Sequence, residues 1–123
     1  MKQRIAITAL SSLSALGQSA YDTWQSDVSP QTCISPQHID EQSYFQACIP
    51  AEDLANIAQL RSTHTQYQLL DETVLYAILV SRAAMAQAGW QGNDQFGINI
   101  GSSRGATHLF EQHHQTFLTT GKL

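Results

Sequence analysis

The feature that most constrains this chain is a long, almost wholly apolar segment from Asp71 to Ala88. Asp71 suits an N-cap, Glu72 suits the positive end of a helix, and Gly89 is a usual residue at which a helix ends. The segment is therefore predicted to be one helix, covered on more than one side by other elements or by a second copy of the chain. Its apolar stripe at helical spacing comprises Val74, Ala77, Ile78, Ser81, Ala84, Met85 and Ala88, widened by Leu75, Leu79 and Ala86.

The residues after this helix change their periodicity. A turn rich in Gly, Asn and Asp precedes an apolar run from Phe96 to Ile100, which we expect to be a strand. Small residues follow from Gly101, and a second helix is expected from about Arg104 to Thr119. A strand, a small-residue corner and a helix make a βα unit, and sites in α/β proteins lie at such corners.

The N-terminal start has two interpretations. A basic beginning followed by an apolar stretch has the outline of a signal peptide. The alternative is a buried strand from Ile5 to Ala9 that leads into a serine-rich loop. We favour the strand because four serines dilute the apolar stretch.

The middle of the chain is predicted to be irregular from residue 29 to residue 50, where three prolines punctuate it. Within it, partial alternation from Ser43 to Ile49 is compatible with a strand. A short helix is expected from Ala51 to Leu60. Its apolar face is expected to comprise Leu54, Ile57 and Ala58.

Charge and hydropathy exclude some classes of partner. The formal net charge is −4 and the six basic residues are scattered, which argues against a nucleic-acid or anionic-membrane surface. The longest apolar run, from Val74 to Val80, is far shorter than the ~20 residues of a membrane-spanning helix.

Several residues could carry chemistry, and each also has a simpler interpretation. Cys33 and Cys48 would pair in an exported protein and stay reduced in the cytosol. His108 and His113 are five residues apart, with His114 adjacent, and lack the spacing of the zinc-protease helix, so no metal is expected. Asp71 and Glu72 are neighbours that point to different sides of a helix, so they form no paired-carboxylate site.

The glycine-rich corner has two interpretations as well. Gly97, Gly101 and Gly105 recur every four residues, which matches neither a dinucleotide fingerprint nor a P-loop. Free amides between Ser103 and Gly105 could still bind an anion. The simpler interpretation is that the glycines let a strand and a helix pack closely.

An ordered set of segments resembles a known family. The segments run from Thr65 to Ala77, from Ala83 to Trp90 and from Phe96 to Gly105, preceded by the apolar start from Ile5 to Leu10 and by Trp24. Their order and spacing resemble the N-terminal part of the β-ketoacyl-(acyl-carrier-protein) synthases, the condensing enzymes of fatty-acid and polyketide synthesis. The resemblance is weak between about Val28 and Gln59.

The resemblance implies an α/β fold, with residues 1–123 forming an N-terminal fragment of a layered thiolase-like fold. It implies an enzyme that condenses acyl thioesters with malonyl units through a cysteine and two histidines, without a cofactor. Those catalytic residues lie later in the family, and neither Cys33 nor Cys48 occupies the family position, so this chain alone is expected to be inactive. Acyl carrier protein is the implied partner, with a homo-oligomer and a cytoplasmic location.

Two departures from the family pattern bear on the site. The family often has Arg-Met-Asp-Arg where this chain has Leu69-Leu70-Asp71-Glu72. Arg104 stands where family members usually carry a small or apolar residue that lines the acyl pocket, so Arg104 is the candidate substrate-binding residue. These departures suggest a specialised pathway or a non-catalytic partner subunit. Two other hypotheses remain: a small exported protein with a Cys33–Cys48 disulfide, and an interaction module that binds through the long helix.

Overall fold

The structure is a computed structural model that describes residues 5–92 and 95–122. It combines helices with one two-stranded antiparallel sheet. The elements in chain order are α1 (Ala20–Val28), β1 (Ile34–Ile39), β2 (Gln42–Ala47), α2 (Ala51–Ser62), the 3-10 helix η1 (Thr65–Leu69), α3 (Glu72–Ala88) and α4 (Thr107–Thr120).

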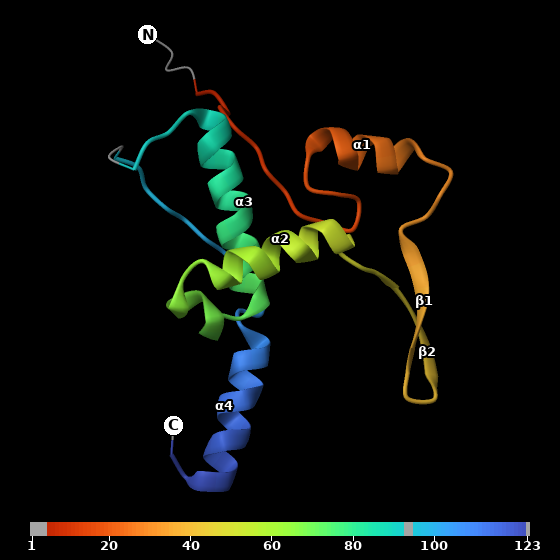
Figure 1. The fold of residues 1–123 in the computed structure, drawn as a ribbon, viewed down its shortest axis with the longest axis vertical. Helices are drawn as coiled ribbons and strands as arrows, with labels where there is room; N and C mark the ends of the chain where they lie inside the picture. Colours follow the sequence, from red (N-terminus) through yellow and green to blue (C-terminus); the bar gives the residue numbers. More distant parts are fainter. Residues whose placement is uncertain (1–4, 93–94, 123) are drawn as a thin grey trace.

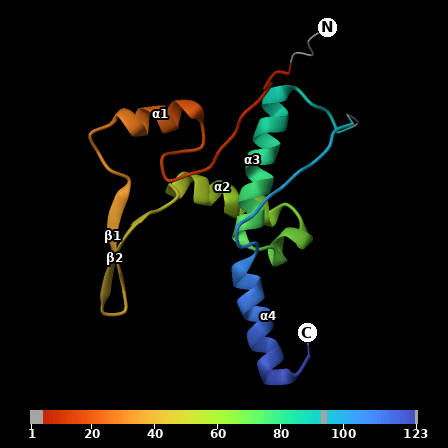
Figure 2. The same cartoon turned by 180° about the vertical axis from the view of Figure 1, so that it is seen from behind.

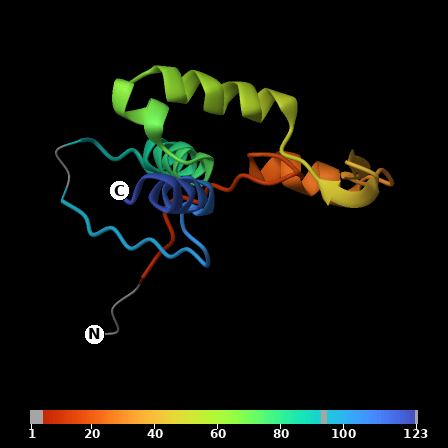
Figure 3. The same ribbon diagram turned by 90° about the horizontal axis from the view of Figure 1, so that it is seen from below.

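The elements spread along two directions instead of closing around one centre (Figure 1). Helices α3 and α4 follow the long axis and run away from each other, so their N-terminal ends meet near the middle of the molecule (Figures 1 and 2). Helix α2 crosses beside α3, and α1 with the β1–β2 hairpin extends to one side (Figure 3). Among the described elements, α2 packs against η1 and α3, whereas the two strands pack against each other.

Helix α3 confirms the prediction of a long helix that ends at Gly89. The Asp71 carboxylate accepts a hydrogen bond from the Thr73 amide at 2.9 Å, which caps the first turn. At the other end, Gly89 has a φ of 72°, and the amides of Gly89 and Trp90 donate to Ala86 and Met85, each at 3.1 Å. These are the bonds of a left-handed C-terminal cap, a conformation that glycine adopts at little steric cost.

Helix α2 confirms the predicted short helix but presents a different face. The buried residues are Asp53, Ile57 and Leu60, whereas Leu54 and Ala58, predicted to share that face, are exposed. The spacing of four and then three residues is that of one helical stripe. The interpretation was wrong because it counted only apolar residues, and the buried stripe begins with a carboxylate.

The core lies where α2 meets α3 and is small. Ile57, Leu60 and Leu75 are its buried apolar residues among the described part of the chain, and Leu75 is fully buried. The sequence pattern places Leu75 at the edge of the apolar stripe of this helix, yet its side chain lies at the centre of the contact between α2 and α3. The partly buried residues that pack against this core are Leu13, Tyr67, Leu70, Tyr76, Ile78 and Leu79.

The β1–β2 hairpin supplies the regular structure of the region predicted to be irregular. The prediction of a strand near Ser43 is confirmed by β2, and β1 pairs with it over its whole length. The strands are joined through Asp40 and Glu41, and Asp40 has a φ of 55°, as tight hairpin turns require. The expectation that residues 29–50 form mostly loop was therefore wrong.

The two other predicted strands do not form in the part of the chain that the structure describes. Both the segment from Ile5 to Ala9 and that from Phe96 to Ile100 lack strand structure. Ile98 is 74% exposed and Ile100 is 70% exposed, so neither side chain enters a core. A strand needs a neighbouring strand for its backbone bonds, and no described segment pairs with either one.

Helix α4 confirms the predicted C-terminal helix and begins three residues later than expected. Gly121, with a φ of 68°, ends it by donating its amide to Phe117 at 2.8 Å. The side chains of Phe110 and Leu118 are exposed, and no residue of α4 is buried. None of the described helices is both long and apolar enough to cross a membrane.

Candidate functional site

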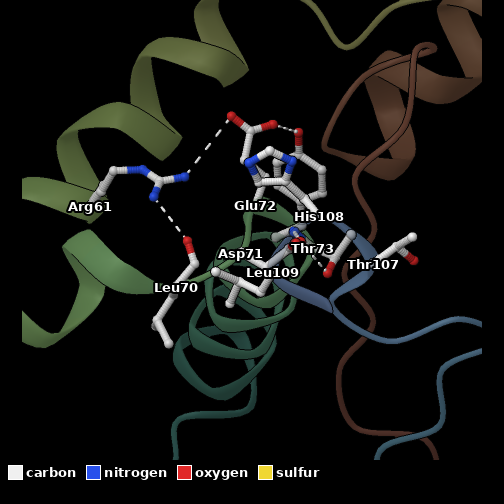
Figure 4. A pocket seen from close by; sticks show the side chains of 9 residues that line it. Arg61, Leu70, Asp71, Glu72, Thr73, Thr107, His108 and Leu109 are labelled. Carbon is white, nitrogen blue, oxygen red and sulfur yellow. Dashed lines mark hydrogen bonds and ion pairs between the residues drawn. The ribbon is translucent and has the colours of Figure 1, made fainter. Parts of the chain in front are cut away.

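A cavity of about 560 Å³ lies where α2, α3 and α4 approach one another (Figure 4). Helix α2 contributes Arg61, and the starts of α3 and α4 contribute most of the remainder. The residues that line it are Arg61, Leu70, Asp71, Glu72, Thr73, Tyr76, Thr107, His108 and Leu109.

Asp71 lies between the N-terminal ends of two helices. Its Oδ1 accepts from the Thr73 amide at 2.9 Å and from the Thr73 hydroxyl at 2.7 Å. These bonds to Thr73 lower the pKa of the Asp71 carboxyl, and the backbone amide of Leu109 and the charge of His108 lower it further, against a smaller opposing effect of burial. Oδ2 is buried and has no hydrogen-bond partner among the described residues, despite the nearby Leu109 amide. The carboxylate thus faces the positive ends of α3 and α4 together.

Arg61 and Glu72 connect α2 to α3 on the same side of the cavity. The Arg61 guanidinium donates to the Leu70 carbonyl at 2.9 Å and lies 3.9 Å from a Glu72 oxygen. The other Glu72 oxygen accepts from the Tyr76 hydroxyl at 2.9 Å. Burial, followed by the hydrogen bond to Glu72 and the charge of Glu72, raises the pKa of Tyr76, so the phenol stays protonated at neutral pH.

These contacts hold the end of α2 against the start of α3. The Thr73 hydroxyl donates to Asp71 and the Tyr76 hydroxyl donates to Glu72, so each hydroxyl lies beside a carboxylate. The Arg61 guanidinium is committed to a carbonyl and a carboxylate of its own chain. The lowered pKa of Asp71 makes its carboxylate a weak base toward the Thr73 hydroxyl.

Arg104, the candidate substrate-binding residue, lies elsewhere. It is exposed in the irregular segment before α4 and is not among the residues that line the cavity. Its proposed place in an acyl pocket stays a prediction.

The glycine corner does not match the close-packing interpretation. Outside the adjacent residues, no described atom lies within 4 Å of the position where a Cβ would stand on Gly97, Gly101 or Gly105, so these glycines do not serve close packing here. The Gly105 amide donates to the Ser102 hydroxyl at 2.8 Å. A bond within the corner therefore already uses one of the amides considered for anion binding.

The cysteines and histidines are dispersed over the surface. Cys33 and Cys48 are both free and exposed beside the hairpin. The imidazole of His114 stacks on Phe110, with ring centroids 6.2 Å apart, while His108 lines the central cavity. Within residues 5–92 and 95–122, no group of three or more His, Cys, Asp or Glu side chains could hold a metal ion.

Sequence reasoning found the Asp71 cap and missed the residues around it. Glu72 and Tyr76 are four residues apart, a spacing that places them side by side on a helix and could have revealed their bond. No local sequence signal shows that Arg61 and His108 lie near Asp71, because their positions depend on how α2 and α4 pack against the start of α3.

Comparison with known proteins finds similar chains among curated proteins. The chain is similar to the 3-oxoacyl-[acyl-carrier-protein] synthase 2 of Coxiella burnetii (strain RSA 493 / Nine Mile phase I), with 29% identity over 128 aligned positions. The similarity covers 98% of this chain and 30% of that protein, so the chain spans less than a third of its relative. No protein-family model matches the chain, and no solved structure matches it. Because 3-oxoacyl and β-ketoacyl are two names for one group, this similarity supports the resemblance drawn from the sequence as a distant relationship to such synthases.

Proposed function

We propose that this chain is the N-terminal part of an acyltransferase of the β-ketoacyl-(acyl-carrier-protein) synthase type. The complete enzyme would condense an acyl thioester with a malonyl unit, both delivered by acyl carrier protein, in fatty-acid or polyketide synthesis. A cytoplasmic location and a thiolase-like α/β fold for the complete enzyme belong to the same proposal.

The observation that carries this proposal is the extent of the similarity. The alignment runs through nearly the entire chain instead of one short motif, although it spans only 30% of the synthase. That extent favours common ancestry over a chance match of one helix. A share of this size supports the interpretation of the chain as one part of a longer enzyme.

The exposed apolar segments agree with the same proposal. The segment from Phe96 to Ile100 carries the side chains of a buried strand but has no strand partner among the described residues. In the complete enzyme, strands from the remainder of the protein would pair with it and cover α3. The chain would then supply one edge of a layered sheet instead of a separate domain.

The decisive experiment uses the natural reading frame extended beyond Leu123. The longer protein is purified and supplied with acyl-loaded and malonyl-loaded carrier protein, and the 3-oxoacyl product is followed by mass spectrometry of the carrier. We expect the longer protein to form this product. We expect residues 1–123 alone to form none, because the removal of a nucleophile with its base costs many orders of magnitude in rate.

A third sample separates an inactive enzyme from a wrong assignment. The longer protein is incubated with acyl-loaded carrier protein but without malonyl-loaded carrier protein, and covalent transfer of the acyl group to the longer protein is measured. Acyl transfer without condensation would still support the family of reactions. A longer protein that accepts no acyl group and decarboxylates no malonyl group would exclude the proposal.

A further inference from the structure

The two cysteines of the chain flank the open end of the β1–β2 hairpin. The ladder runs from the pair Ile39–Gln42 at the turn to the pair Ile34–Ala47 at the open end. Cys33 immediately precedes β1 and Cys48 immediately follows β2. The ladder ends at the pair Ile34–Ala47, and an extension of its register by one residue would set Cys33 opposite Cys48.

Pro36 shows which residue pairs of the hairpin are hydrogen-bonded and which are not. Pro36 has no amide hydrogen, so its pair with Phe45 is of the non-hydrogen-bonded kind. The two kinds alternate, which makes Ile34–Ala47 non-hydrogen-bonded as well. In agreement, the Ile34 amide donates to the Thr32 hydroxyl at 3.1 Å. In a ladder extended by one residue, the cysteines would occupy a position of the kind whose Cα atoms lie about 5.5 Å apart, within the range of about 4.4–6.8 Å found in disulfides.

Both thiols also belong to the same face of the hairpin. Side chains alternate between faces along a strand, so Cys33 shares a face with Ser35, and Cys48 shares a face with Gln46. Ser35 and Gln46 are paired in the ladder. The Gln46 side-chain amide donates to the Cys48 sulfur at 3.4 Å, which places that thiol alongside Gln46. Both cysteines are free and exposed, so a dissolved oxidant can reach them.

We propose that Cys33 and Cys48 form a reversible disulfide that closes the open end of the hairpin. The oxidant is a low-molecular-weight disulfide such as oxidised glutathione. One cysteine thiolate attacks this disulfide, forms a mixed disulfide and releases one small thiol. The second cysteine attacks the protein sulfur of the mixed disulfide and releases the other small thiol. Two protein thiols are oxidised, and one small disulfide is reduced to two thiols.

The Cys33–Cys48 disulfide would act on the hairpin, which packs little against the helices. The hairpin stands apart from the helices in the views of Figures 1 and 2, and its strands pack mainly against each other. Two-stranded hairpins are only marginally stable in water. A disulfide at the open end would join the segment that follows α1 to the segment that precedes α2, so oxidation would fix the hairpin and reduction would release it.

The test is a redox titration of the purified, reduced chain in glutathione buffers. Free thiols are blocked with an alkylating agent, and the protein is cut after Glu41 by a glutamate-specific protease. This cut separates Cys33 from Cys48. We expect the oxidised sample to yield two peptides joined by a disulfide, and the reduced sample to yield the same peptides separately alkylated.

A register-shifted variant provides the matched control. In the double variant Ala47→Cys with Cys48→Ser, one thiol moves by a single residue and turns to the opposite face of the hairpin. We expect its equilibrium constant for disulfide formation against glutathione to be about tenfold lower than that of the natural pair. In concentrated urea, the two proteins should form the disulfide equally well. Equal constants under native conditions would overturn the proposal, as would oxidation that gives only glutathione adducts or disulfide-linked dimers.

Discussion

At the scale of single residues, two carboxylates of this chain should respond to pH in opposite directions. The pKa of Asp71 is lowered, chiefly by its bonds to Thr73, so the contribution of Asp71 to stability is present above the unfolded pKa of about 3.9. That contribution is lost as the pH falls through the lower, folded pKa. In Asp71→Asn, which keeps the cap but cannot titrate, this acid-induced loss should disappear from urea unfolding curves measured at a series of pH values.

Asp53 should behave in the reverse sense. Burial first, then the charges of Glu52 and Asp22, raise the pKa of Asp53 in the folded protein. The folded state then holds the proton more tightly than the unfolded state, so this residue favours folding more as the pH falls through its folded pKa, and the gain is complete below the unfolded pKa of about 3.9. Asp53→Asn should increase the free energy of unfolding at neutral pH and remove this pH dependence. A decrease at neutral pH would show that the charged form is the one that the structure stabilises.

Arg104 gives a prediction for the complete enzyme. Because the resemblance to the synthases implies that Arg104 stands at a position of the acyl pocket, Arg104→Ala in the proposed longer protein should change the preference among acyl chains of different length. The measurement is the ratio of kcat/KM values for a short and a long acyl carrier substrate. Lys122→Ala removes a positive charge beyond the other end of α4 and should leave that ratio unchanged. An unchanged ratio in both variants would mean that Arg104 faces solvent there as it does here.

At the scale of elements, the contact between α2 and α3 supports most of the folded structure. Leu75→Ala removes the one large side chain that is fully buried among residues 5–92 and 95–122, and it should lower the free energy of unfolding by about 2–5 kcal/mol. Leu54→Ala is the matched control, because Leu54 is exposed and should change that free energy by less than about 0.5 kcal/mol. Denaturant unfolding at one fixed protein concentration measures both. A larger loss of stability for Leu54→Ala than for Leu75→Ala would support the face of α2 that the sequence predicted.

The C-terminal end of α3 offers a second test at this scale. Gly89 adopts a φ of 72°, and no atom lies within 4 Å of a Cβ built there, so a substitution meets only backbone strain. Gly89→Ala should therefore cost about 1–2 kcal/mol, and Gly89→Asn should cost less, since asparagine tolerates this conformation better. Equal costs in denaturant unfolding would show that the end of α3 is not held in the left-handed conformation.

The sequence predicted those elements that depend on local signals. The periodicity of the sequence predicts helices α2, α3 and α4. The cap at Asp71 marks the start of α3, and a glycine follows the last residue of α3 and of α4. These signals all act within a few residues. The strands expected from Ile5 and from Phe96 depend on partners elsewhere, and composition alone could not reveal that none of the described segments supplies them. The central cavity was unpredictable for the same reason, because it joins Arg61, Asp71 and His108 from three elements.

At the scale of the whole molecule, the exposed surface is too large for a compact monomer. The accessible surface is 10563 Å². A compact monomer of 13.6 kDa would expose about 6,600 Å². Several large apolar side chains contribute to this surface, among them Ile98, Ile100 and Phe110, which are 74%, 70% and 70% exposed. Large exposed apolar patches are usually covered by another part of the protein or by a partner.

The central claim is that this chain forms one part of a larger layered protein, with surfaces that require covering. Sedimentation velocity of the purified chain over a range of micromolar concentrations tests it most directly. We predict concentration-dependent self-association through the apolar surface of α3 and through unpaired strand edges, because no other chain is present to cover them. A single monomeric species at every concentration, unfolding in one sharp transition, would contradict the claim and identify the chain as a complete domain.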